Sequence, residues 1–91
     1  MRVTDHAVIR FLERVLGWDF SEYAPGMADH EVVRQLETDG IDIEAVRATI
    51  LTETVMLAGR LGATKVHRHD STVVLEDSRV ITILPKEARR R

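Results

Sequence analysis

The apolar positions of the chain repeat with two different periods, and the change falls near residue 61. Before that point apolar residues recur at intervals of three and four, which is typical of amphipathic helices. From residue 65 they alternate and include many β-branched residues, which favours strands. We therefore expect one α+β domain, residues 1–91, with two or three N-terminal helices packed on a small antiparallel β-sheet of at least three strands.

The predicted boundaries are helices over about residues 4–61, antiparallel strands over about 65–84 and a basic tail over 86–91. The first helix begins at Thr4 or Asp5 and ends at Leu16 before Gly17. Its predicted core-facing residues are Ala7, Val8, Phe11, Leu12, Val15 and Leu16. An ordered loop that carries three of the four aromatic residues follows: Trp18, Phe20 and Tyr23.

Two further helices are expected before Gly62. A short helix has Asp29 as its cap and buries three apolar residues, Val32, Val33 and Leu36. A longer helix has Asp42 as its cap. Its predicted inner stripe is Ile43, Val46, Ile50, Thr54, Leu57 and Leu61. Thr52, Thr54 and Gly59 are poor helix formers, which leaves a break in its second half open.

The predicted strands are short and are joined by tight turns. Asp77 and Ser78 fit a two-residue hairpin turn, although the glycine that such turns prefer is missing. Pro85 ends the last strand. The three strands are expected over residues 65–69, 72–76 and 79–84.

The total charge conceals an uneven distribution. The chain has 13 Lys and Arg against 15 Asp and Glu, a formal net charge of −2. Residues 1–59 carry five basic and eleven acidic side chains, a net of −6, whereas residues 60–91 carry eight basic and four acidic, a net of +4. The basic third can form a local phosphate-binding surface, and the acidic segment favours a basic protein partner.

Composition excludes several classes of protein. No apolar run approaches the roughly 20 residues that a membrane-spanning helix needs. The absence of cysteine excludes disulfide scaffolds and cysteine-bound zinc. Residues 1–4 lead into a charged helix rather than a signal peptide. We expect a cytoplasmic protein with no membrane partner and no cofactor.

The most informative chemistry lies on the polar face of the first predicted helix. His6, Arg10, Glu13 and Arg14 fall on one stripe opposite the core face. This segment resembles the opening helix of small toxin and prophage domains of the barnase, EndoU, colicin and RelE ribonuclease group, the BECR fold. The matching residues are His6-Ala7, Arg10 and Glu13-Arg14. The apolar residues on either side of Thr82 resemble the last strand of that family.

The resemblance implies a RelE- or BECR-like fold and a metal-independent endoribonuclease-like domain of a toxin or mobile-element system that cleaves RNA by transesterification. It implies His6 as general acid or base, Arg10 as electrostatic stabiliser, Arg14 as phosphate-binding residue and Thr82 as hydrogen-bond donor. Histidine transfers protons near neutral pH, and the planar arginine fork binds two phosphate oxygens. The alternative is a solvated helix face with ordinary ion pairs.

A second group of candidates lies in the first predicted strand. Alternation puts Lys65, His67 and His69 on one face of that strand. We place His67 and His69 with the catalytic residues, and Lys65 and Arg68 with the RNA-binding residues. A metal site formed by the two histidines and a carboxylate stays open as an alternative, as does an exposed edge strand without function.

The chain departs from the ribonuclease family over residues 18–40, where it has an aromatic loop and an extra helix in place of a short loop. It is also less basic than toxin ribonucleases commonly are. A second hypothesis is therefore a non-catalytic binding or assembly module of a phage or chromosomal complex. In that role the acidic helices and the aromatic loop would contact an antitoxin or another protein partner, or a second copy in a homo-oligomer.

Overall fold

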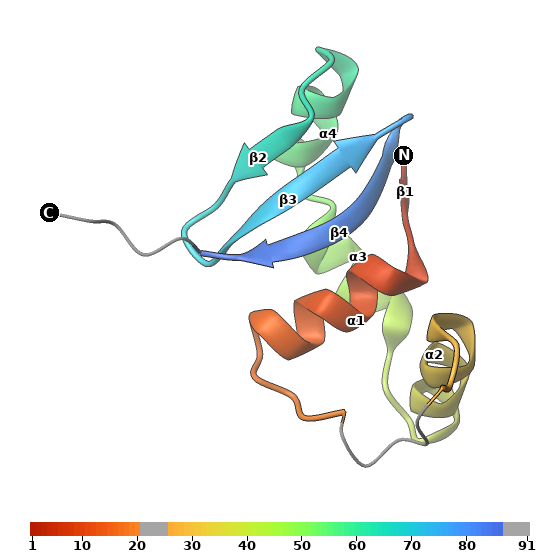
Figure 1. Cartoon of the computed structure of the whole chain (residues 1–91). Helices are drawn as coiled ribbons and strands as arrows, with labels where there is room; N and C mark the ends of the chain where they lie inside the picture. The colour runs from red at the N-terminus through yellow and green to blue at the C-terminus, as the bar shows by residue number, and fades with distance from the viewer. Residues whose placement is uncertain (21–25, 87–91) are drawn as a thin grey trace, which may run out of the picture.

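The chain opens with a strand that the periodicity of the sequence does not predict. The computed structural model describes residues 1–20 and 26–86. Its strands are β1 (Arg2–Val3), β2 (Lys65–His67), β3 (Ser71–Glu76) and β4 (Arg79–Pro85). They form one sheet in the order β1-β4-β3-β2 (Figure 1). β2, β3 and β4 form the predicted antiparallel meander, whereas β1 pairs in parallel with β4, so the sheet is mixed.

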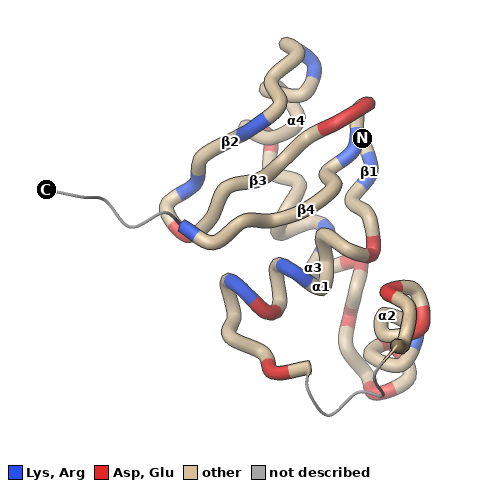
Figure 2. Tube along the Cα trace, viewed as in Figure 1, with Lys and Arg blue, Asp and Glu red and all other residues tan. Residues whose placement is uncertain are grey.

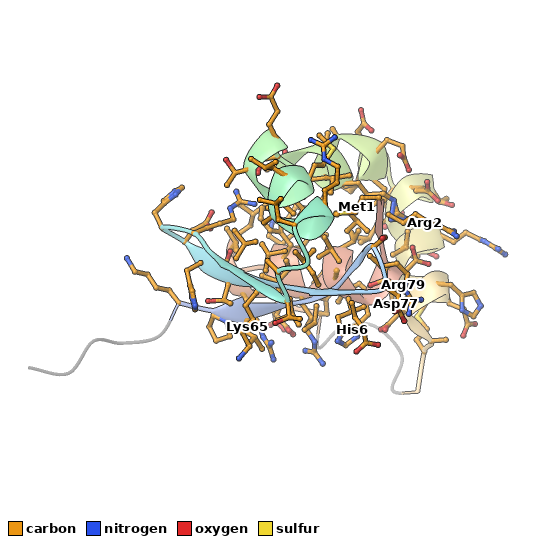
Figure 3. All side chains as sticks on the ribbon, turned by 90° about the horizontal axis from the view of Figure 1, so that it is seen from above. Met1, Arg2, His6, Lys65, Asp77 and Arg79 are labelled. Atoms are coloured by element: carbon orange, nitrogen blue, oxygen red, sulfur yellow. The ribbon has the colours of Figure 1, made fainter. Side chains whose placement is uncertain are left out.

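Helices cover one face and one edge of this sheet. The described part of the chain contains α1 (Asp5–Arg14), α2 (Asp29–Thr38), α3 (Ile43–Ile50) and α4 (Glu53–Arg60). In Figure 1, α3 and α4 lie behind the sheet, and α1 runs beneath β4 between the sheet and α2. The view from above also places α3 and α4 on one side of the sheet (Figure 3). The predicted α+β class is confirmed.

The predicted long helix is broken into α3 and α4 between Ile50 and Glu53. Leu51 leaves the helical conformation with ψ of 68°, and the hydroxyl of Thr52 accepts a hydrogen bond from the Val55 amide at 3.2 Å. Because Thr52 starts a new helix, the inward face shifts, and Val55 is fully buried.

The break also changes the predicted inner stripe. Ile43 and Ile50 are buried as predicted. The prediction is wrong for the second half, where Leu57 and Leu61 are 51% and 77% exposed and Thr54 is also exposed. An uninterrupted period of 3.6 residues does not apply across two separate helices.

Two of the three predicted helix caps are confirmed. Thr4 accepts from the amide of Ala7 at 3.1 Å, and Asp42 accepts from the amide of Ala45 at 3.0 Å. The prediction for α2 is off by one residue. Ala28 is the N-cap of α2, so Asp29 is the first helical residue and its carboxylate is available for other contacts.

The buried apolar residues of the helices and of one sheet face form a single cluster. Its members are Val3, Ala7, Val8, Ile9, Phe11, Leu12, Val32, Val33, Leu36, Ile43, Ile50, Val55, Val73, Leu75, Val80 and Ile83. In α1 four residues of the predicted arc are buried and Val15 packs partly buried against the cluster, but Leu16 is exposed and Ile9 is buried in addition. Trp18 and Phe20 pack against the cluster with ring centroids 6.3 Å apart, whereas Tyr23 lies outside the described residues.

The hairpin between β3 and β4 turns without glycine. Asp77 and Ser78 both have positive φ, 51° and 61°, which confirms the predicted tight turn. Nothing is described of the predicted basic tail beyond Lys86. None of the helices in the described ranges has the length and apolar character needed to cross a membrane.

Candidate functional site

One face of the sheet has no described helix over it. Residues directly opposite each other on neighbouring strands point to the same side of a sheet. The pairing of the strands makes three such rows on this face; the row of Glu76, Arg79 and Arg2 lies next to the hairpin tip, and the other two lie away from it. Of these two, the first is Lys65, Val74 and Thr82, and the second is His67, Thr72 and Leu84. We call the surface formed by these six residues the open face.

The polar side of α1 and the open face are on the same side of the molecule. Figure 3 shows Lys65 and His6 together on the side of the sheet away from α3 and α4. The other face of the sheet carries the fully buried pair Val73 and Ile83. The fold therefore brings together two segments that are about sixty residues apart in the sequence.

Hydrogen bonds fasten both ends of α1 along β4. At the start of the helix, Thr4 donates from Oγ1 to the carbonyl oxygen of Ile81 at 3.3 Å. At its end, Arg14 donates from Nη1 to the carbonyl oxygen of Ile83 at 2.9 Å. The predicted phosphate-binding residue Arg14 therefore uses one of its donors to hold the helix on the strand.

Arg10 lies between these two anchors, one helical turn before Arg14 and on the same helix face. The anchors on β4 are the carbonyls of residues 81 and 83, on either side of Thr82. Arg10 donates from Nη1 to Oε1 of Glu13 at 2.7 Å, and both side chains are partly exposed. A phosphate that binds Arg10 must compete with this exposed ion pair, which is worth about 1 kcal/mol or less.

His6 is held between two charged side chains. Its Nδ1 lies 2.9 Å from Oδ2 of Asp29 in α2, and the Nε–H of Arg10 points to its Nε2 at 3.4 Å. A carboxylate can only accept and a guanidinium can only donate, so both contacts fit a neutral imidazole with its proton on Nδ1. This tautomer leaves the Nε2 lone pair to accept a proton, and the His6 side chain is 42% exposed.

Thr82 lies in the middle row of the open face and is partly buried. Its hydroxyl makes no hydrogen bond to another described residue, so it can donate to a ligand on this face. Its neighbours in the row are the short Val74 on β3 and Lys65 on β2. Lys65 has no carboxylate partner among the described residues.

The structure does not bring the second pair of histidines to His6. His67 lies on β2, two strands from β4, which is about 10 Å at the usual spacing of strands. Its Nδ1 is 3.0 Å from the hydroxyl of Thr72, its partner across the strands. His69 lies beyond the end of β2, and its side chain is 89% exposed.

The two histidines also do not form a metal site with their neighbours. Asp70 is the nearest carboxylate to His69, at 3.9 Å from Nε2, and it also pairs with Arg68 at 3.6 Å. Within residues 1–20 and 26–86, no three His, Cys, Asp or Glu side chains are placed to hold one metal ion.

Arg68 is directed away from the open face. It donates from Nη1 to the carbonyl oxygens of Thr49 and Ile50, both at 3.3 Å, at the C-terminal end of α3. The side chain is 16% exposed. Arg68, predicted to bind RNA, therefore joins β2 to α3, and Lys65 is the cation that β2 presents on the open face.

The charges of the described residues are divided between two parts of the molecule. Figure 2 shows Lys and Arg positions along β2, at the last turn of α1 and at the end of β4. Asp and Glu positions collect on α2 and at the tip of the hairpin between β3 and β4. Basic positions therefore lie next to the open face on β2, α1 and β4, with others on β1, α2, α3 and α4, and the acidic positions gather mainly on α2 and at the hairpin tip.

Asp29 is the site residue that sequence reasoning missed. Its position at the start of a helix predicted a capping role. The contact with His6 spans 23 residues and crosses from α1 to α2, so no local pattern could have revealed it.

Comparison of the chain with protein-family models, with curated proteins and with solved structures finds no match.

Proposed function

We propose that the open face and the polar side of α1 bind RNA, and that the domain is a metal-independent endoribonuclease of a toxin or mobile-element system. The observation that best supports this is the environment of His6. Its imidazole is oriented by Asp29, contacts Arg10 and remains partly exposed beside the open face. A proton acceptor next to an arginine suits transesterification at a phosphodiester.

In the proposed reaction, His6 acts as the base. A ribose 2′-hydroxyl takes the place of Arg10 at Nε2 and gives its proton to that atom while O2′ bonds to phosphorus. The P–O5′ bond breaks, which leaves a 2′,3′-cyclic phosphate, and water supplies the proton to O5′. Asp29 stabilises the imidazolium that forms, because its carboxylate accepts the Nδ1–H.

Arg10 and Thr82 stabilise the phosphate in this proposal. Once displaced from Nε2, the guanidinium of Arg10 is free to bind the phosphate oxygens on which negative charge increases. The hydroxyl of Thr82, which has no described partner, donates to another oxygen. Arg10 comes between Thr4 and Arg14 in the chain, and the side chains of those two residues bind the carbonyls on either side of Thr82.

Lys65 and His67 are assigned to binding rather than to proton transfer. Their strand, β2, lies about 10 Å from β4, with β3 between the two. Their position on the open face suits a neighbouring part of the RNA backbone. His69, beyond the strand and highly exposed, adds charge only when it is protonated.

Incubation of the purified protein with total RNA and with tRNA tests the proposal. We expect cleavage products that end in a 2′,3′-cyclic phosphate, and His6→Ala should reduce the rate by about a hundredfold or more. His30→Ala is the matched control, because His30 is exposed on α2 with no described side-chain partner. Absence of cleavage, or equal rates for the wild type and His6→Ala, would contradict the catalytic proposal.

A second candidate is an assembly module, and the exposed leucines of α4 favour it. Leu57 in α4 and Leu61, the residue directly after α4, are four positions apart and are both more than half exposed. The acidic positions on α2 supply a separate surface for a basic protein such as an antitoxin. This candidate predicts self-association in light scattering that Leu61→Glu abolishes and that Arg10→Ala leaves unchanged.

A further inference from the structure

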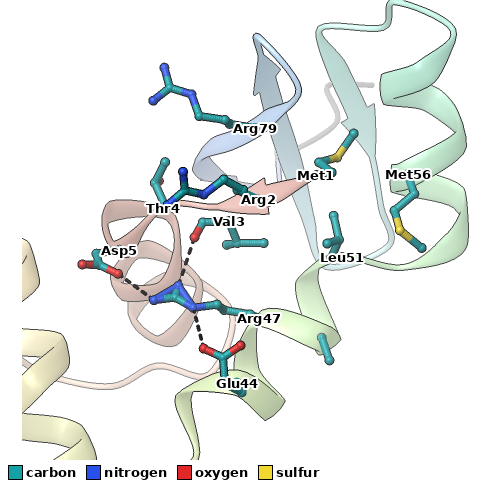
Figure 4. Close-up of a pocket in the computed structure, with 11 residues that line it drawn as sticks. Met1, Arg2, Val3, Thr4, Asp5, Glu44, Arg47, Leu51, Met56 and Arg79 are labelled. Carbon is teal, nitrogen blue, oxygen red and sulfur yellow. Dashed lines mark hydrogen bonds and ion pairs between the residues drawn. The ribbon is translucent and has the colours of Figure 1, made fainter.

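The parallel pairing of β1 with β4 places two arginines directly opposite each other. Arg2 is the register partner of Arg79, and the two strands are about 4.8 Å apart. Like charges in such a pair repel each other and destabilise a sheet. Figure 4 shows both side chains leaving the neighbouring strands in the same direction. This arrangement therefore has a cost unless an anion lies between the guanidinium groups.

No described carboxylate neutralises this pair. Asp5 and Glu44, the nearest acidic residues in Figure 4, are both bound to Arg47, at 2.7 Å and 3.2 Å. Neither Arg2 nor Arg79 forms an ion pair with another described residue. Both guanidinium groups are therefore left without an ion-pair partner among the described residues.

Glu76 is the acidic residue that competes most directly with an anionic ligand for the guanidinium of Arg79. It is the register partner of Arg79 on β3, the strand on the side opposite β1. Its carboxylate is not within 4.0 Å of the Arg79 guanidinium, so it weakens the positive potential without occupying the site. Asp77 follows it at the hairpin tip and adds a second, more exposed negative charge.

The two arginines also border a cavity of about 820 Å³. Its wall between β1, α3 and α4 includes apolar side chains as well as the Arg47 cluster (Figure 4). The apolar lining residues are Met1, Val3, Ala48, Leu51 and Met56. A cavity with an apolar wall and a cationic rim suits a small molecule that has an apolar or aromatic part and an anionic end.

We propose that Arg2 and Arg79 bind the terminal phosphate of a small phosphorylated molecule whose body enters this cavity. A phosphate dianion matches two guanidinium groups in charge, and each planar fork can donate to two of its oxygens. The site does not include His6, Arg10 or Thr82, so it stands independently of the proposed ribonuclease activity.

A nuclear magnetic resonance titration of the full chain tests this site. The probes are inorganic phosphate, AMP and adenosine, added at constant ionic strength, and the signals are those of Arg2 and Arg79. We expect saturating shifts with phosphate and with AMP, tighter binding of AMP than of phosphate, and none with adenosine. Equal affinities for phosphate and AMP would show that only the two arginines contribute to binding, and would overturn the role of the cavity.

Variants that each lose one positive charge distinguish a specific binding site from nonspecific attraction of anions. Arg79→Gln should weaken binding of AMP by about tenfold, the effect expected for loss of one charge-assisted contact. Arg34→Gln, which removes an exposed charge from α2, should change it less than twofold. Glu76→Gln should tighten binding, because it removes the competing carboxylate. Shifts that never saturate, or equal losses in Arg79→Gln and Arg34→Gln, would overturn the proposal.

Thermal unfolding supplies a second measurement that does not depend on catalysis. Arg79→Gln removes both the repulsion from Arg2 and the attraction to Glu76, so the Tm of each protein without ligand is its own reference. Phosphate should raise the Tm of the wild type more than that of the variant, because only the native pair binds it. An equal increase in both proteins would also overturn the proposal.

Discussion

Arg14 donates from Nη1 to the carbonyl oxygen of Ile83 at 2.9 Å, and this contact joins the last turn of α1 to the edge of β4. The partner strand on that edge, β1, pairs only with Arg79 and Val80. Beyond that point, side chains of α1 take the place of a neighbouring strand. The helix that carries His6 and Arg10 is thereby held in a defined position on the sheet.

We expect Arg14→Ala to lower the free energy of unfolding by about 1 kcal/mol, because the carbonyl of Ile83 loses a charge-assisted donor. Chemical denaturation measures the change. Arg34→Ala removes an equivalent charge from the exposed face of α2 and should stay within about 0.5 kcal/mol of the wild type. Equal effects of the two substitutions would show that the contact with Ile83 does not stabilise the fold.

Arg47 joins α3 to the N-terminal residues of the chain in β1 and α1. It donates to the carbonyl of Val3 at 3.0 Å, to Asp5 at 2.7 Å and to Glu44 at 3.2 Å, with its side chain 24% exposed. We expect Arg47→Met to cost about 2 kcal/mol in denaturant unfolding, because Asp5 and a backbone carbonyl lose their donor. Glu44→Gln, at an 81% exposed position, should cost less than about 0.5 kcal/mol.

Ser78 occupies the left-handed region with φ of 61° in the turn between β3 and β4. Glycine adopts this conformation without the steric cost that a Cβ imposes. Ser78→Gly should therefore raise the free energy of unfolding by about 0.5 to 1 kcal/mol in thermal or chemical denaturation. Ser78→Ala keeps the Cβ and should give no such gain, and a gain in both variants would refute this explanation.

Gly59 lies inside α4 under the side chain of Met1. A Cβ at this position would meet Cε of Met1, the far end of a flexible side chain, whereas the nearest atom of Leu75 is 4.0 Å away. Because Met1 can move aside, Gly59→Ala should stabilise the protein by up to about 1 kcal/mol through helix propensity. Ala58→Gly in the same helix should have the opposite effect. Destabilisation by Gly59→Ala would mean that the Met1 contact is rigid.

The shifted inner face of α4 can be tested by truncation. Val55 is fully buried, whereas Leu61 is 77% exposed. We expect Val55→Ala to cost about 2 kcal/mol and Leu61→Ala to stay within about 0.5 kcal/mol, measured by denaturant unfolding. A larger loss of stability in Leu61→Ala than in Val55→Ala would instead support one continuous helix with Leu61 on its inner side.

The fold was predictable wherever the signal is local. Thr4 and Asp42 cap helices because their side chains reach an amide three residues ahead. The periodicity of helices identifies the buried side of an element, as Val8 and Leu12 show. Prediction failed at Leu57 and Leu61, because the inner stripe was drawn as one continuous helix, whereas the break that the poor helix formers had left open occurs at Thr52 and changes the inward face.

The candidate site was predictable only in part. The stripe of His6 and Arg10 follows from the spacing of four residues along a helix. The role of Arg68 was not predictable, because the carbonyls of α3 that it binds are 18 and 19 residues away in sequence. The same holds for Asp29, which meets His6 across the contact between α1 and α2.

The order of residues along the chain therefore specified the helices, the hairpin and the polar stripe of α1, because capping, turn chemistry and periodicity act within a few residues. The packing of the folded chain specified the neighbours of each charged side chain. It directed Arg68 to α3 and Asp29 to His6, and it set Arg2 against Arg79 through a two-residue parallel strand. Such contacts depend on the three-dimensional path of the backbone between the partners, which no spacing of residue types encodes.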